Sequence, residues 1–377
     1  MSRLDDRLAR AALSRLAEPG DVRLTALVAE LGAVRVHELL LSGNDDDGLA
    51  DDVASRLTRV DPVRELEQAE RLGLRFVTPA DDEWPHQLRG LEGVPALHER
   101  GGVPVGLWVR GPLPLNEVEC SVAVVGARAS TSYGDTAAGE IGGCAALADV
   151  AVISGAAFGI DVAAHRGALA VGGQTVAVLA CGADRIYPGA HAELIGHIAR
   201  TGAVVSEAPP GCAPQRIRFL ARNRLIAALA RGTVVVEAAR RSGALNTANW
   251  ATRLNRPLMG VPGPVTSAAS AGIHEQIRHG AMALVTSGAD VLELVGQAGE
   301  HLVEQPASTL SARDRLGSRQ RQVLDAVPVS TPALADSIAR VAGMRLLDVR
   351  SALTKLERAG LVASEADGWR LAGAARD

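Results

Sequence analysis

An arginine-rich segment occupies the chain between Ala208 and Val236. It contains no aspartate or glutamate, and Phe219 lies among its basic residues. A guanidinium group can hold a phosphate through two parallel hydrogen bonds, and an aromatic ring can stack on a base. A basic helix face without acidic partners therefore predicts binding to an anion that carries both groups. The arginines of the segment are Arg216, Arg218, Arg222, Arg224 and Arg231.

Three glycine-containing turns could bind anions through backbone N–H groups. The first, VAVVGARAST at 122–131, places Arg128 just after Gly126, where the backbone can approach a ligand closely. The second joins Ser154 and Gly155 to a helix that is expected from Ile160 onward. The third contains Arg240, Arg241, Ser242 and Gly243, with a helix expected from Ala244.

The sequence offers little support for catalysis. Asp161 and His165 are four residues apart on one expected helix face, but no third metal ligand is evident, so capping and hydrogen bonding are the favoured interpretation. No Ser/His/Asp triad, Walker loop or carboxylate pair has a recognisable spacing. Glu207 and Glu237 follow expected strands, where they could pair with arginine. No metal, cofactor or enzymatic activity is predicted.

Composition limits the class of protein. The 377 residues have a net charge of −4, so nucleic-acid binding must depend on local arginine clusters. Aromatic residues make up only 2% of the chain, which makes an aromatic beside a polar motif informative. The four cysteines lack metal-binding spacing, and no signal peptide or membrane span is recognised. The chain is expected to be cytoplasmic.

Six apolar runs alternate with helical patterns between residues 73 and 300, and this alternation predicts a Rossmann-like α/β domain with an open parallel sheet. Ligands of such sheets bind outside the carboxyl ends of the strands, where the motifs described above fall. The runs are Val122–Val125, Val150–Ile153, Thr175–Leu179, Ala203–Val205, Thr233–Val236 and Leu258–Val261.

Two smaller domains are expected to flank this sheet. Residues 1–72 have helical periodicity and predict a SAM-like or helix-hairpin-helix domain, with Gly32 ending one helix and an acidic loop over 44–52. After a linker at 301–317, residues 318–377 predict a winged helix. Its second helix is expected to begin at Thr331-Pro332. The mixed charge of its third helix leaves duplex DNA and a protein equally suitable as partners.

Several motifs occur together in the order VGAR, SGxxxGIDxxAH, YP, SExxxG, RNR and RSGxL. In this order, from about Asp81 to Leu294, they resemble the DprA/Smf family. The resemblance implies a homodimer that binds and protects single-stranded DNA and helps to load RecA during natural transformation. The implied DNA-binding residues are Arg128, Ser154, Gly155, Arg222, Asn223, Arg224, Arg241, Ser242 and Gly243. Phe219 matches the aromatic of the family's HFPxRNR pattern, and Arg218 stands at its histidine.

The chain departs from that family pattern at a few positions. Leu220 replaces the proline of HFPxRNR, and Phe158 stands where a basic residue often precedes GID. A basic contact is then lost there or replaced by stacking. His274 stands at the asparagine of a later GxN motif.

Two other functions remain open from the sequence. Phosphoribohydrolases that cleave nucleotides use a similar anion-binding fold, but the PGGxGT loop of those enzymes is absent, and the matching region reads EAARRSGALNT. The protein could also be a regulatory module in which the winged helix binds duplex DNA.

Overall fold

The computed structural model describes residues 3–42, 60–297, 299–301 and 316–372. The chain divides into two compact units, Met1–Val303 and Glu304–Asp377. Each unit has a hydrophobic core of its own. The expected linker at 301–317 lies almost wholly outside the described residues.

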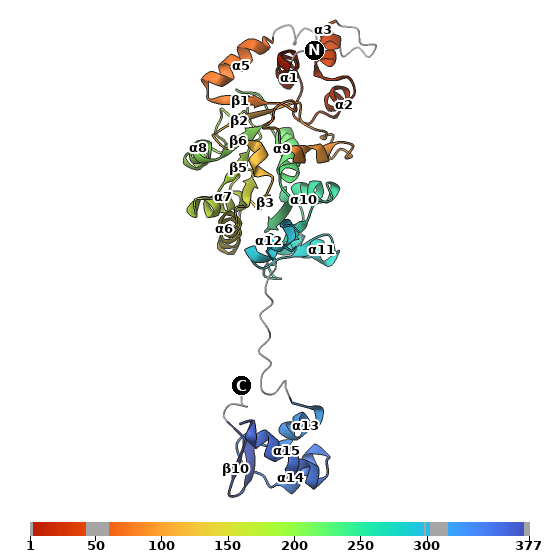
Figure 1. Cartoon of the computed structure of the whole chain (residues 1–377), viewed down its shortest axis with the longest axis vertical. Helices are drawn as coiled ribbons and strands as arrows, with labels where there is room; N and C mark the ends of the chain where they lie inside the picture. The colour runs from red at the N-terminus through yellow and green to blue at the C-terminus, as the bar shows by residue number, and fades with distance from the viewer. Residues whose placement is uncertain (1–2, 43–59, 298, 302–315, 373–377) are drawn as a thin grey trace. The chain divides into compact units, whose positions relative to one another are not determined.

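A nine-stranded sheet forms the centre of the first unit, in the order β1-β2-β6-β5-β4-β3-β7-β8-β9 (Figure 1). All neighbouring strands from β6 to β9 are parallel, whereas β2 pairs antiparallel with both β1 and β6. The expected Rossmann-like α/β fold is confirmed. The strands are β1 Leu74–Val77, β2 Leu107–Arg110, β3 Ser121–Gly126, β4 Ala151–Ser154, β5 Thr175–Val178, β6 Ala203–Ser206, β7 Gly232–Val236, β8 Leu258–Gly260 and β9 Ala283–Leu284.

Helices cover both faces of the sheet because its central strands are apolar on both sides. Val122 and Val124 of β3 pack into the core beneath α6, α7 and α12, whereas Ala123 and Val125 face the core beneath α9 and α10. The helices of this part are α6 Ser132–Leu147, α7 Ile160–Ala170, α8 Ala192–Thr201, α9 Arg216–Leu229, α10 Ala244–Arg253, α11 Ala271–Arg278 and α12 Gly288–Val295. Short 3-10 turns are η1 His86–Leu91, η2 Leu115–Val118, η3 Gly189–His191 and η4 Ala268–Ser270.

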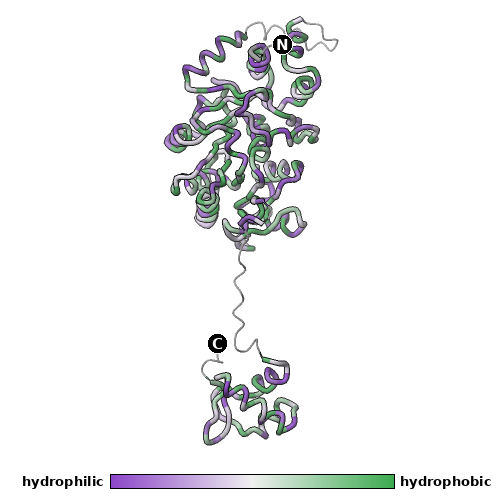
Figure 2. Tube along the Cα trace, viewed as in Figure 1, coloured by the Kyte–Doolittle hydropathy of each residue, from purple (hydrophilic) through white to green (hydrophobic). Residues whose placement is uncertain are grey.

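The N-terminal helices belong to the same compact unit as the sheet, so the expected boundary at residue 72 does not separate two bodies. Ala11 and Ala69 share a core with Phe76 and Trp108 of the antiparallel strands. Gly32 ends its helix as expected, with φ 81° and its N–H donating to the carbonyl of Val28. The helices are α1 Arg3–Leu16, α2 Val22–Leu31, α3 Ala33–Ser42 and α5 Pro62–Arg71, of which α5 is predominantly hydrophilic (Figure 2). The expected acidic loop lies outside the described residues.

The second unit contains three helices and an antiparallel hairpin, which are the elements of the predicted winged helix. The expected helix start at Thr331-Pro332 is wrong. Ala333 instead pairs with Trp369 through two backbone hydrogen bonds of 3.0 and 2.8 Å, and this extended pairing delays the helix to Ala335. The elements are α13 Ser318–Ala326, α14 Ala335–Ala342, α15 Leu346–Arg358, β10 Val362–Glu365 and β11 Gly368–Leu371.

Across the described part of the chain, none of the helices has the length and apolar character that crossing a membrane requires.

Candidate functional site

The order of the strands reverses at β3. The chain runs from β3 through β4, β5 and β6 in one direction and then returns to place β7 on the other side of β3. Loops that leave neighbouring carboxyl ends diverge at such a point and leave room for a ligand. The loops after β3, β4, β5 and β7 all leave from this edge of the sheet, so the topology brings together motifs that are separated in the sequence.

A hollow of about 280 Å³, open solvent included, lies at this edge and is lined by Arg128, Gly155, Ala157, Phe158, Tyr187, Pro188 and Phe219. Three of its seven residues are aromatic, in a chain that is only 2% aromatic. Phe158 is 48% exposed and Tyr187 is 42% exposed. Exposed aromatic rings around a hollow offer apolar faces on which a flat ligand can stack.

Arg128 is the exposed cation of this hollow. Its guanidinium carbon lies 5.0 Å from the centre of the Phe219 ring, within cation–π distance. The ring of Tyr187 lies 5.8 Å from the same phenylalanine. Arg128 is thus an exposed cation beside the Phe219 ring, which the Tyr187 ring meets at a tilted angle of 60°.

The loop after β4 is already occupied by an anion of the chain itself. The carboxylate of Asp161 accepts hydrogen bonds from the backbone N–H groups of Gly155 at 3.2 Å and Ala157 at 3.3 Å. Burial raises the pKa of Asp161, and the nearby Arg222 opposes this shift. The anion cradle expected at this loop therefore serves to fix the loop's own shape.

Gly155 packs against Arg222. A Cβ atom at this position would lie 1.5 Å from a terminal nitrogen of Arg222, so a larger residue would displace the guanidinium from its present place. Arg222 is buried, donates to the carbonyl of Val178 at 3.0 Å and lies 5.8 Å from the Phe219 ring. It supports the floor of the hollow and is not an exposed contact.

Arg224 does not reach the surface, contrary to expectation. Its side chain is 0% exposed and makes two hydrogen bonds of 2.6 Å to the carboxylate of Glu207, with a third of 3.1 Å to the carbonyl of Gly102. Removing both charged groups from water is tolerated because each satisfies the other. The structure assigns Arg224 to the interior of the protein, where a phosphate has no access.

Two further residues expected at the interface are also buried. The hydroxyl of Ser154 donates to the carbonyl of Val124 at 2.6 Å, which ties β4 to β3. The amide of Asn223 donates to Asn246 at 3.1 Å and joins α9 to α10. Both residues hold the scaffold beneath the hollow, and neither presents its polar group to solvent.

Arg218 is paired with an acidic residue from the N-terminal helices. Glu18 accepts two hydrogen bonds of 2.7 Å from its guanidinium group. The basic face of α9 was expected to lack acidic partners because none occurs within the segment from Ala208 to Val236. Glu18 contradicts that expectation for Arg218. The separate expectation that Glu207 pairs with an arginine is confirmed by its bonds to Arg224.

The loop that contains Arg241, Ser242 and Gly243 leaves the carboxyl end of β7, beside the end of β3. Arg241 and Gly243 are exposed, and the Ser242 hydroxyl accepts from the N–H of Ala244 at the start of α10. Glu237, at the end of β7, accepts hydrogen bonds from the N–H and hydroxyl of Thr131 and pairs with no arginine there. This loop thus presents a charged surface next to the β3 motif.

His165 is a structural residue. It is fully buried, its Nδ1 lies 2.7 Å from the Thr175 hydroxyl, and burial lowers its pKa to about 3. No cluster of three or more potential metal ligands occurs among the residues that the structure describes. The four cysteines are all unpaired.

Four residues of the hollow were not among the predicted site residues. They come from the loops after β4 and β5 and are Ala157, Phe158, Tyr187 and Pro188. The shortage of aromatic residues was the available signal, because two of the chain's three phenylalanines and one of its two tyrosines line this hollow.

The open, mostly parallel sheet, with its strand order reversing at β3, places the chain in the class of Rossmann-like proteins, whose ligands bind outside the carboxyl ends of the strands at such a point. Within that class, residues 75–296 match the family model of DNA recombination-mediator protein A. The chain is 45% identical to a Mycobacterium tuberculosis protein that is named as a DNA processing protein DprA. The match covers 95% of this chain and 92% of the relative. It is also 35% identical to protein Smf of Escherichia coli, over 77% and 76% of the two chains. The chain belongs to the DprA/Smf family.

Solved structures agree with this assignment. DNA processing protein A from Streptococcus pneumoniae matches with a TM-score of 0.64 and 33% identity, over 78% of this chain and 98% of that one. DprA from Helicobacter pylori matches with a TM-score of 0.51 and 26% identity, over 58% and 94%. The latter structure was described for its mode of binding single-stranded DNA.

Proposed function

We propose that this protein binds single-stranded DNA in the hollow at the carboxyl ends of β3, β4 and β5. The observation that carries the proposal is the grouping of Arg128 with three aromatic residues around one open hollow. A phosphate would accept hydrogen bonds from Arg128, while bases would stack on Phe158, Tyr187 or Phe219. In duplex DNA the bases are already stacked on each other, so this chemistry favours a single strand.

The exposed loop after β7 would extend the same surface. Arg241, Ser242 and Gly243 would contact the sugar–phosphate backbone as the strand leaves the hollow. The contacts with the DNA strand would then extend across the ends of β4, β3 and β7, which are neighbours in the sheet. A backbone-following site of this kind binds many sequences with similar affinity.

We also propose a binding role without catalysis. None of the seven residues that line the hollow is acidic, and Glu207 and Glu237 are both engaged in structural hydrogen bonds. In the cytoplasm, the protein would protect single strands as a homodimer and help to load RecA onto them during recombination. Family membership supports these roles. In a host that is competent for natural transformation, the protein would perform them during that process.

The experiment is a binding titration with oligo-dT that compares the wild-type chain with Phe158→Ala and Phe219→Ala. Because loss of one stacked base costs about 1–3 kcal/mol, each substitution should weaken binding roughly 5- to 150-fold. Leu147→Ala is the control, since Leu147 is 73% exposed at the end of α6 and lies outside the hollow. Full affinity in both phenylalanine variants would overturn the proposed site.

A further inference from the structure

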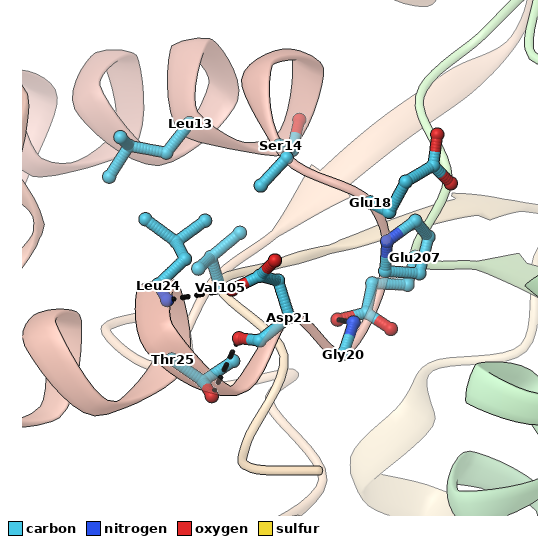
Figure 3. A pocket seen from close by; sticks show the side chains of 11 residues that line it. Leu13, Ser14, Glu18, Gly20, Asp21, Leu24, Thr25, Val105 and Glu207 are labelled. Atoms are coloured by element: carbon cyan, nitrogen blue, oxygen red, sulfur yellow. Dashed lines mark hydrogen bonds between the residues drawn. The ribbon is translucent and has the colours of Figure 1, made fainter. Parts of the chain in front are cut away.

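The loop between α1 and α2, residues 17–21, lies against the arginine helix α9. Its position is fixed by the backbone of Gly20, whose N–H donates to Glu207 at 3.2 Å and whose carbonyl accepts from Gly101 at 2.9 Å. Figure 3 shows Glu207 beside Gly20, with Glu18 on the same loop. An acidic side chain of the N-terminal helices is thereby held next to α9.

Glu18 engages one edge of the Arg218 guanidinium, formed by Nε and one terminal nitrogen. Its two carboxylate oxygens each lie 2.7 Å from a guanidinium nitrogen, and the remaining terminal nitrogen donates to the carbonyl of Ala213 at 2.6 Å. The hydrogen bond to Glu18 is the main cause that raises the pKa of Arg218. A carboxylate in a guanidinium fork carries the same single negative charge as a phosphodiester and accepts the same two parallel hydrogen bonds.

Arg218 lies at the border of the proposed DNA site. It directly precedes Phe219, which lines the aromatic hollow, and it lines a neighbouring crevice together with Arg222. Pro19 of the α1–α2 loop lines the same crevice. A nucleotide stacked on Phe219 would therefore bring its adjacent phosphate toward the position that the Glu18 carboxylate occupies.

We propose that Glu18 occupies a phosphate subsite on Arg218 and competes with single-stranded DNA for it. This inference rests on the proposed function of the hollow. The free protein holds Arg218 neutralised by Glu18, and a bound strand replaces that carboxylate with one of its own phosphates. Glu18 thus sets the affinity for DNA from a residue outside the Rossmann-like sheet.

The exposure of Glu18 makes such an exchange feasible. The Glu18 side chain is 39% exposed and that of Arg218 is 11% exposed, whereas the fully buried pair of Arg224 and Glu207 is closed to solvent. The bonds of Gly20 hold the loop without Glu18. The carboxylate can rotate into water while the loop stays in place.

The test uses the full chain with Glu18→Gln, Arg218→Gln and both substitutions together, each titrated with oligo-dT at two salt concentrations. Glu38→Gln is the matched control, because it removes the same charge from the N-terminal helices at an exposed pair with Arg35. Glu18→Gln should bind roughly three- to tenfold tighter at low salt, because the strand no longer has to displace a carboxylate before its phosphate binds Arg218. Glu38→Gln should bind like the wild type, and Arg218→Gln should abolish the gain.

Three results would overturn the competition. They are an unchanged or weaker affinity in Glu18→Gln, an equal gain in Glu38→Gln, or a gain that survives Arg218→Gln. Thermal unfolding of each variant establishes that the compared proteins are folded. Failure of the proposed function itself is distinguishable, because the wild-type chain would then not bind oligo-dT at all.

Discussion

The arginines of α9 carry the same charge but perform different tasks, and their surroundings decide which. Arg224 is enclosed with Glu207, Arg222 donates to Val178 at the end of β5, and Arg218 is held by the half-exposed Glu18. Arg128, from a different loop, is the exposed guanidinium beside the Phe219 ring. Sequence alone could count these charges, but it could not assign them, because Glu18 lies 200 residues from its partner.

Arg224→Ala should lower the stability of the fold. Any effect on DNA binding should follow only from that loss of stability. The substitution leaves the Glu207 carboxylate buried without its partner, a change that costs about 3–5 kcal/mol of unfolding free energy. Chemical denaturation followed by circular dichroism measures this loss, and Arg128→Ala, at an exposed position, should be within about 0.5 kcal/mol of wild type. A fully stable Arg224→Ala protein with weak DNA binding would restore Arg224 as a direct contact.

At the level of elements, apolar runs predicted the parallel strands well. All six expected runs form strands, with ends shifted by about one residue, because a strand buried on both faces leaves a continuous apolar signal. The antiparallel strands β1 and β2 were not predicted. Each has only four residues and includes an arginine, so neither stands out from its surroundings. Strand β9 has two residues and leaves no pattern at all.

The site could be predicted as an edge of the sheet but not as a set of side chains. The topology alone places the loops after β3, β4 and β7 together, and Arg128, Gly155 and Phe219 do meet in the hollow. Ser154, Asn223 and Arg224 belong to the same motifs but face the interior. Motif membership does not show which way a side chain points, and that direction depends on packing between distant segments.

His165 links helix α7 to two strands and should make this connection sensitive to acid. Its ring contacts the Thr175 hydroxyl of β5, which in turn donates to the carbonyl of Val152 in β4. The folded pKa is lowered to about 3 from an ordinary value of 6.5, so between these values the unfolded chain takes up a proton that the folded chain does not. The contribution of His165 to the unfolding free energy is complete above its ordinary pKa of 6.5. It is lost as the pH falls toward the folded pKa of about 3.

The measurement is the unfolding free energy of wild type and His165→Asn at about pH 7.5 and about pH 5, on either side of the ordinary histidine pKa. The wild type should lose more stability on acidification than the variant, although the variant starts lower because of its smaller side chain. Burial lowers the pKa of His37 as well, but that contribution is common to both proteins and cancels in the comparison. Equal losses in the two proteins would show that His165 does not titrate in this way.

At the scale of the whole molecule, two units with separate cores share one chain. The first contains the hollow and the N-terminal helices that supply Glu18. The second exposes Val341 and Leu347, 72% and 80% exposed, on either side of the turn between α14 and α15. A helix that reads base edges needs polar donors and acceptors at this position, and Arg345 is the exposed basic residue of the turn. From the apolar side chains we propose that this unit contacts a protein.

Deletion of residues 304–377 should therefore leave DNA binding in place. The truncated chain keeps the complete core of the first unit, and it should bind oligo-dT as tightly as the full chain does. Any affinity for duplex DNA should also be the same in both proteins. Gel shifts with each type of DNA test this expectation, and a selective loss of duplex binding would make the second unit a DNA-binding module.

The most direct test of the DNA site is the salt dependence of oligo-dT binding by wild type and Arg128→Ala, measured by fluorescence anisotropy beside a duplex competitor. The wild type should bind the single strand in preference to the duplex, with an affinity that falls steeply as salt increases. Loss of one phosphate contact should weaken the variant and reduce the log–log salt slope by about 0.7. Identical affinities and slopes in the two proteins would contradict the assignment of the hollow as the DNA site.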